Sequence, residues 1–213
     1  TGKIIKDSTG APVYIPGTLK SVKAIGWYIK EYGIAQISMN LTNIQVTPVH
    51  IAFDEVNKKA TERGIRVTGS ELIGLIPLKC MLDAGRYFLG KQQRSTGVSD
   101  AELIKIAIKS LGLDDLTPFK PEERIIEYLL QDKSANPLIG LNLTEFADET
   151  ASESAAPGGG SISAYVGVLG VSLGTMVANL SAHKPGWDNR WQEFSGWAEK
   201  GQAYKNQLLR LVD

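Results

Sequence analysis

The residues best suited to perform chemistry in this sequence form a glycine-rich segment, Ala156-Pro157-Gly158-Gly159-Gly160-Ser161. Three glycines behind a proline predict a loop whose backbone comes close to another group. Ser161 is suited to cap the apolar run at 162–182, so the loop would lead to a helix N-terminus whose free amide N–H groups face outward. Such a terminus binds anions readily. A plain linker between two domains explains the same glycines equally well.

Two further polar residues, His50 and Glu71, stand beside apolar runs. Thr47-Pro48 predicts a helix start with a hydroxyl N-cap, and the positive end of the helix dipole should keep His50 neutral and able to form hydrogen bonds. A purely structural histidine is the alternative. Glu71, in Gly69-Ser70-Glu71, would need a partner if buried, which predicts either a ligand-facing acceptor or the partner of an arginine.

Other kinds of site find little support in the sequence. No metal-ligand spacing, phosphate-loop lysine, Cys/His pair or nucleophile elbow occurs. The 23 basic and 23 acidic residues cancel, which argues against a nucleic-acid partner. The single cysteine, Cys80, excludes an internal disulfide and fits a reducing compartment such as the cytoplasm, and its apolar surroundings predict a buried thiol rather than a nucleophile. Arg86, Lys91 and Arg94 form a local basic patch, for which a solvated face is the default interpretation.

Alternating side chains predict two strands, at 22–29 and 34–41, joined by a loop in which Gly33 can adopt a positive φ. One face of this hairpin is apolar and is expected to be buried, and it includes Ile25, Trp27 and Ile37. The other face carries small or hydrogen-bonding groups, among them Asn40, which leave room for a ligand to lie on the sheet. A solvated face is the alternative there.

Helical periods follow the hairpin, together with two further predicted strands. The helices are expected at 49–60, 78–89 and 100–111, and the strands at 65–68 and 124–130. An order near ββαβααβ predicts an α+β domain whose helices cover one face of the sheet.

Beyond a polar linker, the remaining sequence is predicted to be helical. Residues 157–182 contain no charge and are long enough for a membrane span. Their many hydroxyl and amide side chains favour instead a helix buried on all sides in a soluble helical array. The last predicted helix carries Trp187, Trp191 and Phe194 at helical spacing, which is typical of a core or a subunit interface. Its period runs to Asp213 without a stop signal, and the first residues show no signal-peptide pattern, so we expect a fragment open at both ends.

Five segments of the first part together resemble the C-terminal subdomain of glutamate formiminotransferase. They are Lys23-Ala24-Ile25-Gly26-Trp27, Gln36-Ile37-Ser38-Met39-Asn40-Leu41, Val46-Thr47-Pro48-Val49-His50, Gly69-Ser70-Glu71-Leu72-Ile73-Gly74-Leu75-Ile76-Pro77 and Arg124-Ile125-Ile126-Glu127-Tyr128-Leu129. The segment at 156–161 and the helix behind it resemble the opening of the formiminotetrahydrofolate cyclodeaminase domain. In this order they resemble the bifunctional formiminotransferase-cyclodeaminase family, which implies a first domain at 1–131, a linker at 132–141 and the N-terminal part of a helical domain at 142–213.

The resemblance implies a ferredoxin-like α+β subdomain followed by the beginning of an all-α helical domain. It also implies two reactions, which connect histidine degradation to one-carbon metabolism. In the first, the formimino group of formiminoglutamate moves to N5 of tetrahydrofolate. In the second, the product is cyclised to 5,10-methenyltetrahydrofolate with loss of ammonia. Tetrahydrofolate, which can be polyglutamylated, is implied as a substrate without a metal cofactor, and the implied protein is a cytoplasmic homo-oligomer with neither a nucleic-acid nor a membrane partner.

The resemblance also suggests site residues. Contacts with folate are expected from Asn40, His50, Gly69, Ser70 and Glu71. The cyclodeaminase loop, Gly158, Gly159, Gly160 and Ser161, is expected to hold a polyglutamate carboxylate or a pterin edge through its backbone N–H groups.

The catalytic groups implied by the resemblance are incomplete in this sequence. The family's transferase histidine belongs to an N-terminal subdomain that this sequence does not contain, so His50 is not assigned that role. The cyclodeaminase aspartate belongs to a Leu-Val-Asp-x-Asp-type segment, so Asp213 is either the catalytic carboxylate or lies just before it. We therefore expect the isolated chain to be inactive. A non-catalytic folate-binding or assembly module is the alternative.

Overall fold

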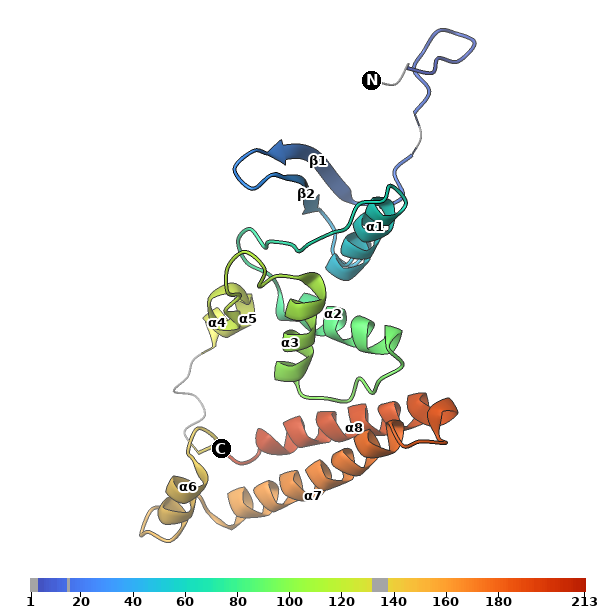
Figure 1. Cartoon of the computed structure of the whole chain (residues 1–213). Helices are drawn as coiled ribbons and strands as arrows, with labels where there is room; N and C mark the ends of the chain where they lie inside the picture. The colour runs from blue at the N-terminus through green and yellow to red at the C-terminus, as the bar shows by residue number, and fades with distance from the viewer. Residues whose placement is uncertain (1–3, 15, 132–137) are drawn as a thin grey trace. The chain divides into compact units, whose positions relative to one another are not determined.

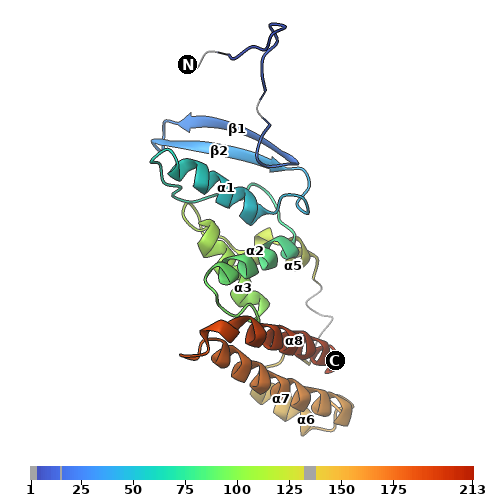
Figure 2. The ribbon, with the colours of Figure 1, turned by 90° about the vertical axis from the view of Figure 1, so that its right-hand side faces the viewer.

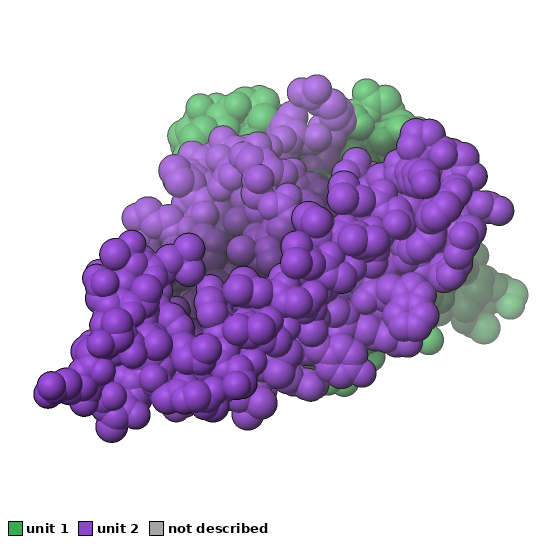
Figure 3. All heavy atoms as spheres, turned by 90° about the horizontal axis from the view of Figure 1, so that it is seen from below, with its two compact units in different colours: residues 1–65 green, residues 66–213 purple. Residues whose placement is uncertain are grey.

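The computed structural model describes residues 4–14, 16–131 and 138–213. The chain divides into two compact units, residues 1–65 and residues 66–213 (Figure 3). The first unit contains the sheet, and the regular structure described in the second unit is helical apart from one isolated bridge.

The first unit consists of a two-stranded hairpin and one helix. β1 (Val22–Ile29) pairs antiparallel with β2 (Ile34–Leu41), with Val22 opposite Leu41 and Ile29 opposite Ile34. Gly33 lies in the turn with a φ of +66°, so the predicted strands and their turn are confirmed. α1 (Val49–Thr61) runs along one face of the hairpin (Figure 2).

The predicted division of the hairpin into an apolar and a polar face is wrong. Ile25 lies opposite Ser38 and Trp27 opposite Gln36, so each of these apolar side chains shares a face with a polar one. Ile37, opposite Gly26, belongs to the other face. The exposed fractions are 65% for Ile25, 45% for Trp27 and 51% for Ile37. The predicted burial is therefore wrong as well, because the register mixes apolar and polar side chains on each face and residues 65–68 form no further strand. Two strands and one helix bury little of a sheet's surface.

α2 (Leu78–Lys91) and α3 (Asp100–Leu111) pack against each other and form the main core of the second unit. The side chains that are at most 1% exposed include Met81, Ala84, Leu103 and Ala107. Ser99 caps α3 by accepting a hydrogen bond from the Glu102 N–H at 3.3 Å, and Gly112 ends the helix with a φ of +64°. The predicted start and stop of this helix are therefore confirmed.

Two short helices, α4 (Pro121–Arg124) and α5 (Ile126–Leu130), occupy the region predicted as the last strand, so that prediction is wrong. A proline at the first helical position, followed by two glutamates in the first turn, favours a helix start. Ile125 lies between the two helices, is fully buried, and forms a parallel bridge with Ile76. Within the described residues the sheet has two strands, and the predicted α+β arrangement followed by helices is confirmed in this reduced form.

The last part of the chain contains a long antiparallel helix pair. Of the linker predicted at 132–141, residues 132–137 lie outside the described residues. The helices beyond it are α6 (Leu143–Thr150), α7 (Gly159–Ala182) and α8 (Trp191–Leu209). α7 and α8 lie side by side and are connected through a short 3-10 helix, Asp188–Arg190 (Figure 1). Thr175 packs so closely on Gly201 that a Cβ at Gly201 would collide with it.

α7 is the one helix in the described part of the chain whose length and composition would allow it to span a membrane. The prediction that it is buried on all sides is wrong in this structure, because only 17% of its most apolar stretch is buried. Val168, Thr175 and Ala178 are among its buried residues, whereas Leu173 and Leu180 are exposed. α8 therefore covers one side of α7 and leaves another side open.

Candidate functional site

Asn40 and His50, the predicted folate residues of the first unit, lie on either side of the loop that joins β2 to α1. Asn40 is exposed near the end of β2, where it lies opposite Lys23. His50 lies in the first turn of α1 and is buried, with 7% of its surface exposed. The structure thus places an exposed amide and a buried imidazole at the two ends of one short loop.

Hydrogen bonds fix the loop that carries His50. Asn43 Oδ1 accepts from the Gln45 N–H at 3.0 Å, and Thr47 Oγ1 donates to the Lys20 carbonyl O at 2.6 Å. Thr47 is therefore not the N-cap that the sequence predicts: Pro48 takes that position, and α1 has no side-chain cap. The hydroxyl is used by a carbonyl group 27 residues earlier, which local sequence patterns cannot reveal.

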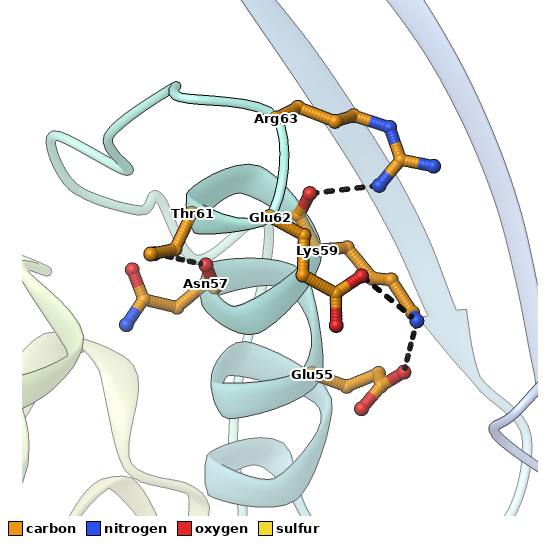
Figure 4. Close-up of polar contacts among 6 residues, drawn as sticks. All are labelled: Glu55, Asn57, Lys59, Thr61, Glu62 and Arg63. Atoms are coloured by element: carbon orange, nitrogen blue, oxygen red, sulfur yellow. Dashed lines mark hydrogen bonds and ion pairs between the residues drawn. The ribbon is translucent and has the colours of Figure 1, made fainter.

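The opposite end of α1 carries a network of polar contacts on the surface (Figure 4). Lys59 Nζ lies 3.2 Å from Glu62 Oε2 and 3.9 Å from Glu55 Oε1, and the Arg63 guanidinium donates to the Lys59 carbonyl O at 2.8 Å. Ion pairs of this kind stabilise a helix by only about 0.2–0.5 kcal/mol each. We therefore assign a structural role to this end of the helix.

Gly69, Ser70 and Glu71 lie in the second unit, beside the C-terminus of α3. Ser70 donates from its N–H to the Gly112 O at 3.0 Å and from its Oγ to the Leu111 O at 2.5 Å. A Cβ at Gly69 would collide with the side chain of Asp115. Gly69 and Ser70 therefore hold this segment on α3, whereas the Glu71 side chain is exposed and accessible to a ligand.

The glycine segment forms the start of α7 rather than a long loop. Gly158 is the N-cap, without a side-chain cap, and Gly159 and Gly160 belong to the first helical turn. Ser161 lies inside the helix, so the prediction that it is the N-cap is wrong. Gly158, Gly159 and Gly160 are exposed, and a Cβ at either of the last two would meet nothing within 4 Å. The backbone N–H groups of this terminus are accessible, as an anion site requires.

Asp213 lies at the same end of the α7 and α8 pair as the glycine segment (Figure 1). Its Oδ1 accepts hydrogen bonds from the N–H groups of Leu138, at 2.7 Å, and Ile139, at 3.4 Å. The carboxylate therefore holds the beginning of the helical segment in place. The antiparallel pairing of α7 and α8 thus places the glycine segment and Asp213, the two features assigned to the cyclodeaminase, at the same end of the helix pair. The catalytic role of Asp213 stays a prediction.

Cys80 is buried in α2, as predicted. Burial, and to a lesser degree the negative charge of Asp83, raises the pKa of its thiol. A raised pKa lowers the thiolate fraction at neutral pH and makes Cys80 a poor nucleophile. Across residues 4–14, 16–131 and 138–213, no three His, Cys, Asp or Glu side chains are grouped so that they could hold a metal ion.

One cavity of the second unit, lined by both polar and apolar side chains, is not predicted from the sequence. It lies between the turn at 94–98 and the pair of α7 and α8, and its polar lining includes Arg94, Asn179, His183, Gln202 and Lys205. These side chains come from three separate segments, so no local spacing connects them. The only related signal in the sequence is the local basic patch that includes Arg94.

Comparisons with known proteins match both parts of the chain. The family model described as "Formiminotransferase domain" matches residues 2–131, and the one described as "Formiminotransferase-cyclodeaminase" matches residues 142–213. These matches confirm the resemblance inferred from the sequence.

Individual relatives carry the same names. A mouse formimidoyltransferase-cyclodeaminase is 39% identical over 199 residues, which cover 93% of this chain and 37% of the relative. The pig protein of the same name is 44% identical over 167 residues, covering 78% of this chain and 31% of the relative. A glutamate formimidoyltransferase of Thermoplasma acidophilum is 37% identical over 73 residues, covering 34% of this chain and 24% of that protein. The chain thus spans about one third of the length of its bifunctional relatives.

Proposed function

Because the chain belongs to the formiminotransferase-cyclodeaminase family, we propose that it forms part of a bifunctional folate enzyme. The observation that carries this proposal is the alignment with the mouse protein, which covers 93% of the chain and therefore includes parts of both matched segments in one order. The matches to both family models, at residues 2–131 and 142–213, support the same proposal.

The proposed substrates are formiminoglutamate and tetrahydrofolate, the latter possibly polyglutamylated, with no resident metal. The first segment would help to transfer the formimino group to N5 of tetrahydrofolate. The second would help to cyclise the product to 5,10-methenyltetrahydrofolate with release of ammonia, as part of histidine degradation. We also propose a homo-oligomer in the cytoplasm.

Within this function, Asn40, His50 and Glu71 are the proposed folate contacts. Asn40 and His50 belong to the first unit and Glu71 to the second, and each contact is proposed by itself. Asn40 and Glu71 are exposed, so a ligand can reach each side chain, and the buried His50 would support the contact at Asn40. Gly69 and Ser70 keep Glu71 in place through their contacts with the end of α3. The open N-terminus at Gly158–Ser161 is the proposed anion contact of the cyclodeaminase.

A chimera tests the proposal. The segment of the mouse relative that aligns with this chain is replaced by the corresponding residues of this chain, and formimino transfer and ammonia release are measured separately. We expect both rates to stay within about tenfold of those of the mouse protein, which corresponds to about 1.4 kcal/mol of activation free energy. Folding of the chimera is checked by circular dichroism. A folded chimera that binds tetrahydrofolate but catalyses neither reaction would favour the second candidate, a non-catalytic folate-binding or assembly module.

The same chimera tests the role of Glu71. Glu71→Ala should raise the Kd for tetrahydrofolate about tenfold, because a hydrogen bond to a charged group contributes about 1.5 kcal/mol or more. Glu62→Ala is the matched control, since Glu62 is also an exposed glutamate but pairs with Lys59 at the far end of α1. Equal affinities of the two variants would show that Glu71 does not contact folate.

A further inference from the structure

The cavity beside the turn at 94–98 has a volume of about 450 Å³ and lies outside the residues proposed for folate. It is formed where the connection between α2 and α3 meets the α7 and α8 pair. The residues that line it are Arg94, Val98, Ser172, Thr175, Met176, Asn179, Leu180, His183, Gln202 and Lys205.

The turn is anchored firmly to both helices. The Gly97 carbonyl O accepts from Asn179 Nδ2 of α7 at 2.9 Å and from Gln202 Nε2 of α8 at 3.3 Å. The Thr96 N–H donates to Ser195 Oγ at 2.9 Å. A Cβ at Gly97 would collide with Ala198. The cavity therefore has a fixed wall, which a ligand site on a mobile loop would lack.

The same hydrogen bonds orient a cation toward the cavity. Gln202 uses its Nε2 for the Gly97 carbonyl, and its Oε1 accepts from Lys205 Nζ at 2.8 Å. Lys205 is half-buried, and Arg94 supplies a second positive charge from the turn. Among the described residues that line the cavity none is acidic. Glu199 of α8, which does not line the cavity, accepts a hydrogen bond from Thr96 Oγ1.

His183 contributes a neutral group rather than a third charge. His183 is exposed, but partial desolvation, and then the positive charge of Arg94, lowers the pKa of its imidazole below the ordinary value, so at pH 7 the ring is mostly neutral. The hydroxyl groups of Ser172 and Thr175 donate to carbonyl groups of their own helix. The charge of the cavity is therefore set by Arg94 and Lys205.

Apolar side chains form the rest of the lining, namely Val98, Met176 and Leu180. From this combination of two cations and an apolar wall, we propose that the cavity binds a small organic anion. Its charged oxygens would pair with Arg94 and Lys205, and its apolar body would lie against Met176 and Leu180. A carboxylate and a phosphate ester share this chemistry, whereas a bare inorganic anion would leave the apolar wall uncovered.

Four probes of known chemistry test the proposal on the 213-residue chain by two-dimensional amide NMR. Benzoate and phenyl phosphate carry an apolar ring with a carboxylate or a phosphate head, inorganic phosphate lacks the ring, and benzamide lacks the charge. We expect at least one of the two ring-bearing anions to shift the amide signals of Gly97, Asn179 and Gln202 with a Kd of about 1 mM, a typical value for so small a ligand. The stronger of the two identifies the head group. Inorganic phosphate and benzamide should bind at least about tenfold more weakly, since each loses one of the two interactions.

Lys205→Ala should weaken binding of the stronger probe by about tenfold, because one charge-assisted contact is lost. Lys200→Ala is the matched control: it removes the same charge from the same helix, but Lys200 lies over the Trp197 ring, 4.7 Å from its centre, and does not line this cavity. Circular dichroism confirms that both variants fold. Equal affinities of the two variants, benzamide binding as tight as benzoate, or no shift up to about 20 mM probe, well above the expected Kd, would each overturn the proposal.

Discussion

Gly97 is the residue on which the contact between the turn at 94–98 and the helix pair depends. It is buried, and its missing side chain lets the turn approach the backbone of Ala198 and Glu199. We expect Gly97→Val to lower the free energy of unfolding by about 1–3 kcal/mol, because a side chain there overpacks a tight contact. Urea unfolding followed by circular dichroism measures the change.

Gly90→Ala is the control for this residue. Gly90 lies in α2, where a Cβ would meet nothing within 4 Å, so alanine should stabilise the chain by about 0.5–1 kcal/mol through its better helix propensity. An unchanged free energy of unfolding in Gly97→Val would contradict this expectation. It would show that the turn can move away from the helix pair, and that its close packing on Ala198 does not stabilise the chain.

At the scale of single elements, substitutions at the N-terminus of α7 can distinguish a structural role of its glycines from a role in ligand binding. Gly160 lies in the first turn and has free space around its Cα, so Gly160→Ala should stabilise the helix by about 0.5–1 kcal/mol. If a ligand approaches this backbone, the added methyl group should also slow ammonia release several-fold in the chimera. We expect both changes together, stability by thermal unfolding and ammonia by a coupled assay.

Gly196 in α8 provides the comparison for α7. It also has no neighbour within 4 Å of an added Cβ, so Gly196→Ala should stabilise its helix without affecting ammonia release. Unchanged ammonia release in Gly160→Ala, with the expected gain in stability, would assign the glycines to helix initiation alone.

Elements with a clear local pattern could be predicted from the sequence, whereas contacts between distant segments could not. The two strands of the hairpin and their turn follow from local sequence, although the register that sets their faces does not, and α3 has both a serine cap and a glycine stop. Residues 124–130 are rich in β-prone side chains, yet Pro121 starts a helical turn there and Glu127 accepts from the Leu78 N–H at 2.6 Å. That contact, 49 residues apart, has no local signal.

The same limit applied to the candidate site. The segment Gly69-Ser70-Glu71 could be selected from its composition and its resemblance to a family. The structural reason for a glycine at position 69 could not be predicted from the sequence. Gly69 is close to Asp115, and Ser70 bonds to Leu111, 41 residues away. The cavity at Arg94 and Lys205 has no local signal either, because two helices and a turn each contribute only part of its lining.

At the scale of the whole molecule, burial is uneven, and this predicts uneven stability. Strand residues Trp27 and Ile37 are about half exposed, whereas Met81 and Leu103, in the core of α2 and α3, are at most 1% exposed. Local opening requires less free energy where few apolar side chains are buried. Hydrogen exchange followed by mass spectrometry should therefore show amides of the β1 and β2 hairpin exchanging at least about 100-fold faster than those of α2 and α3, a difference of about 2.7 kcal/mol in opening free energy. Equal protection would mean instead that residues 1–65 and 66–213 open as one cooperative structure, since two strands and one helix would be too small to reach that stability by themselves.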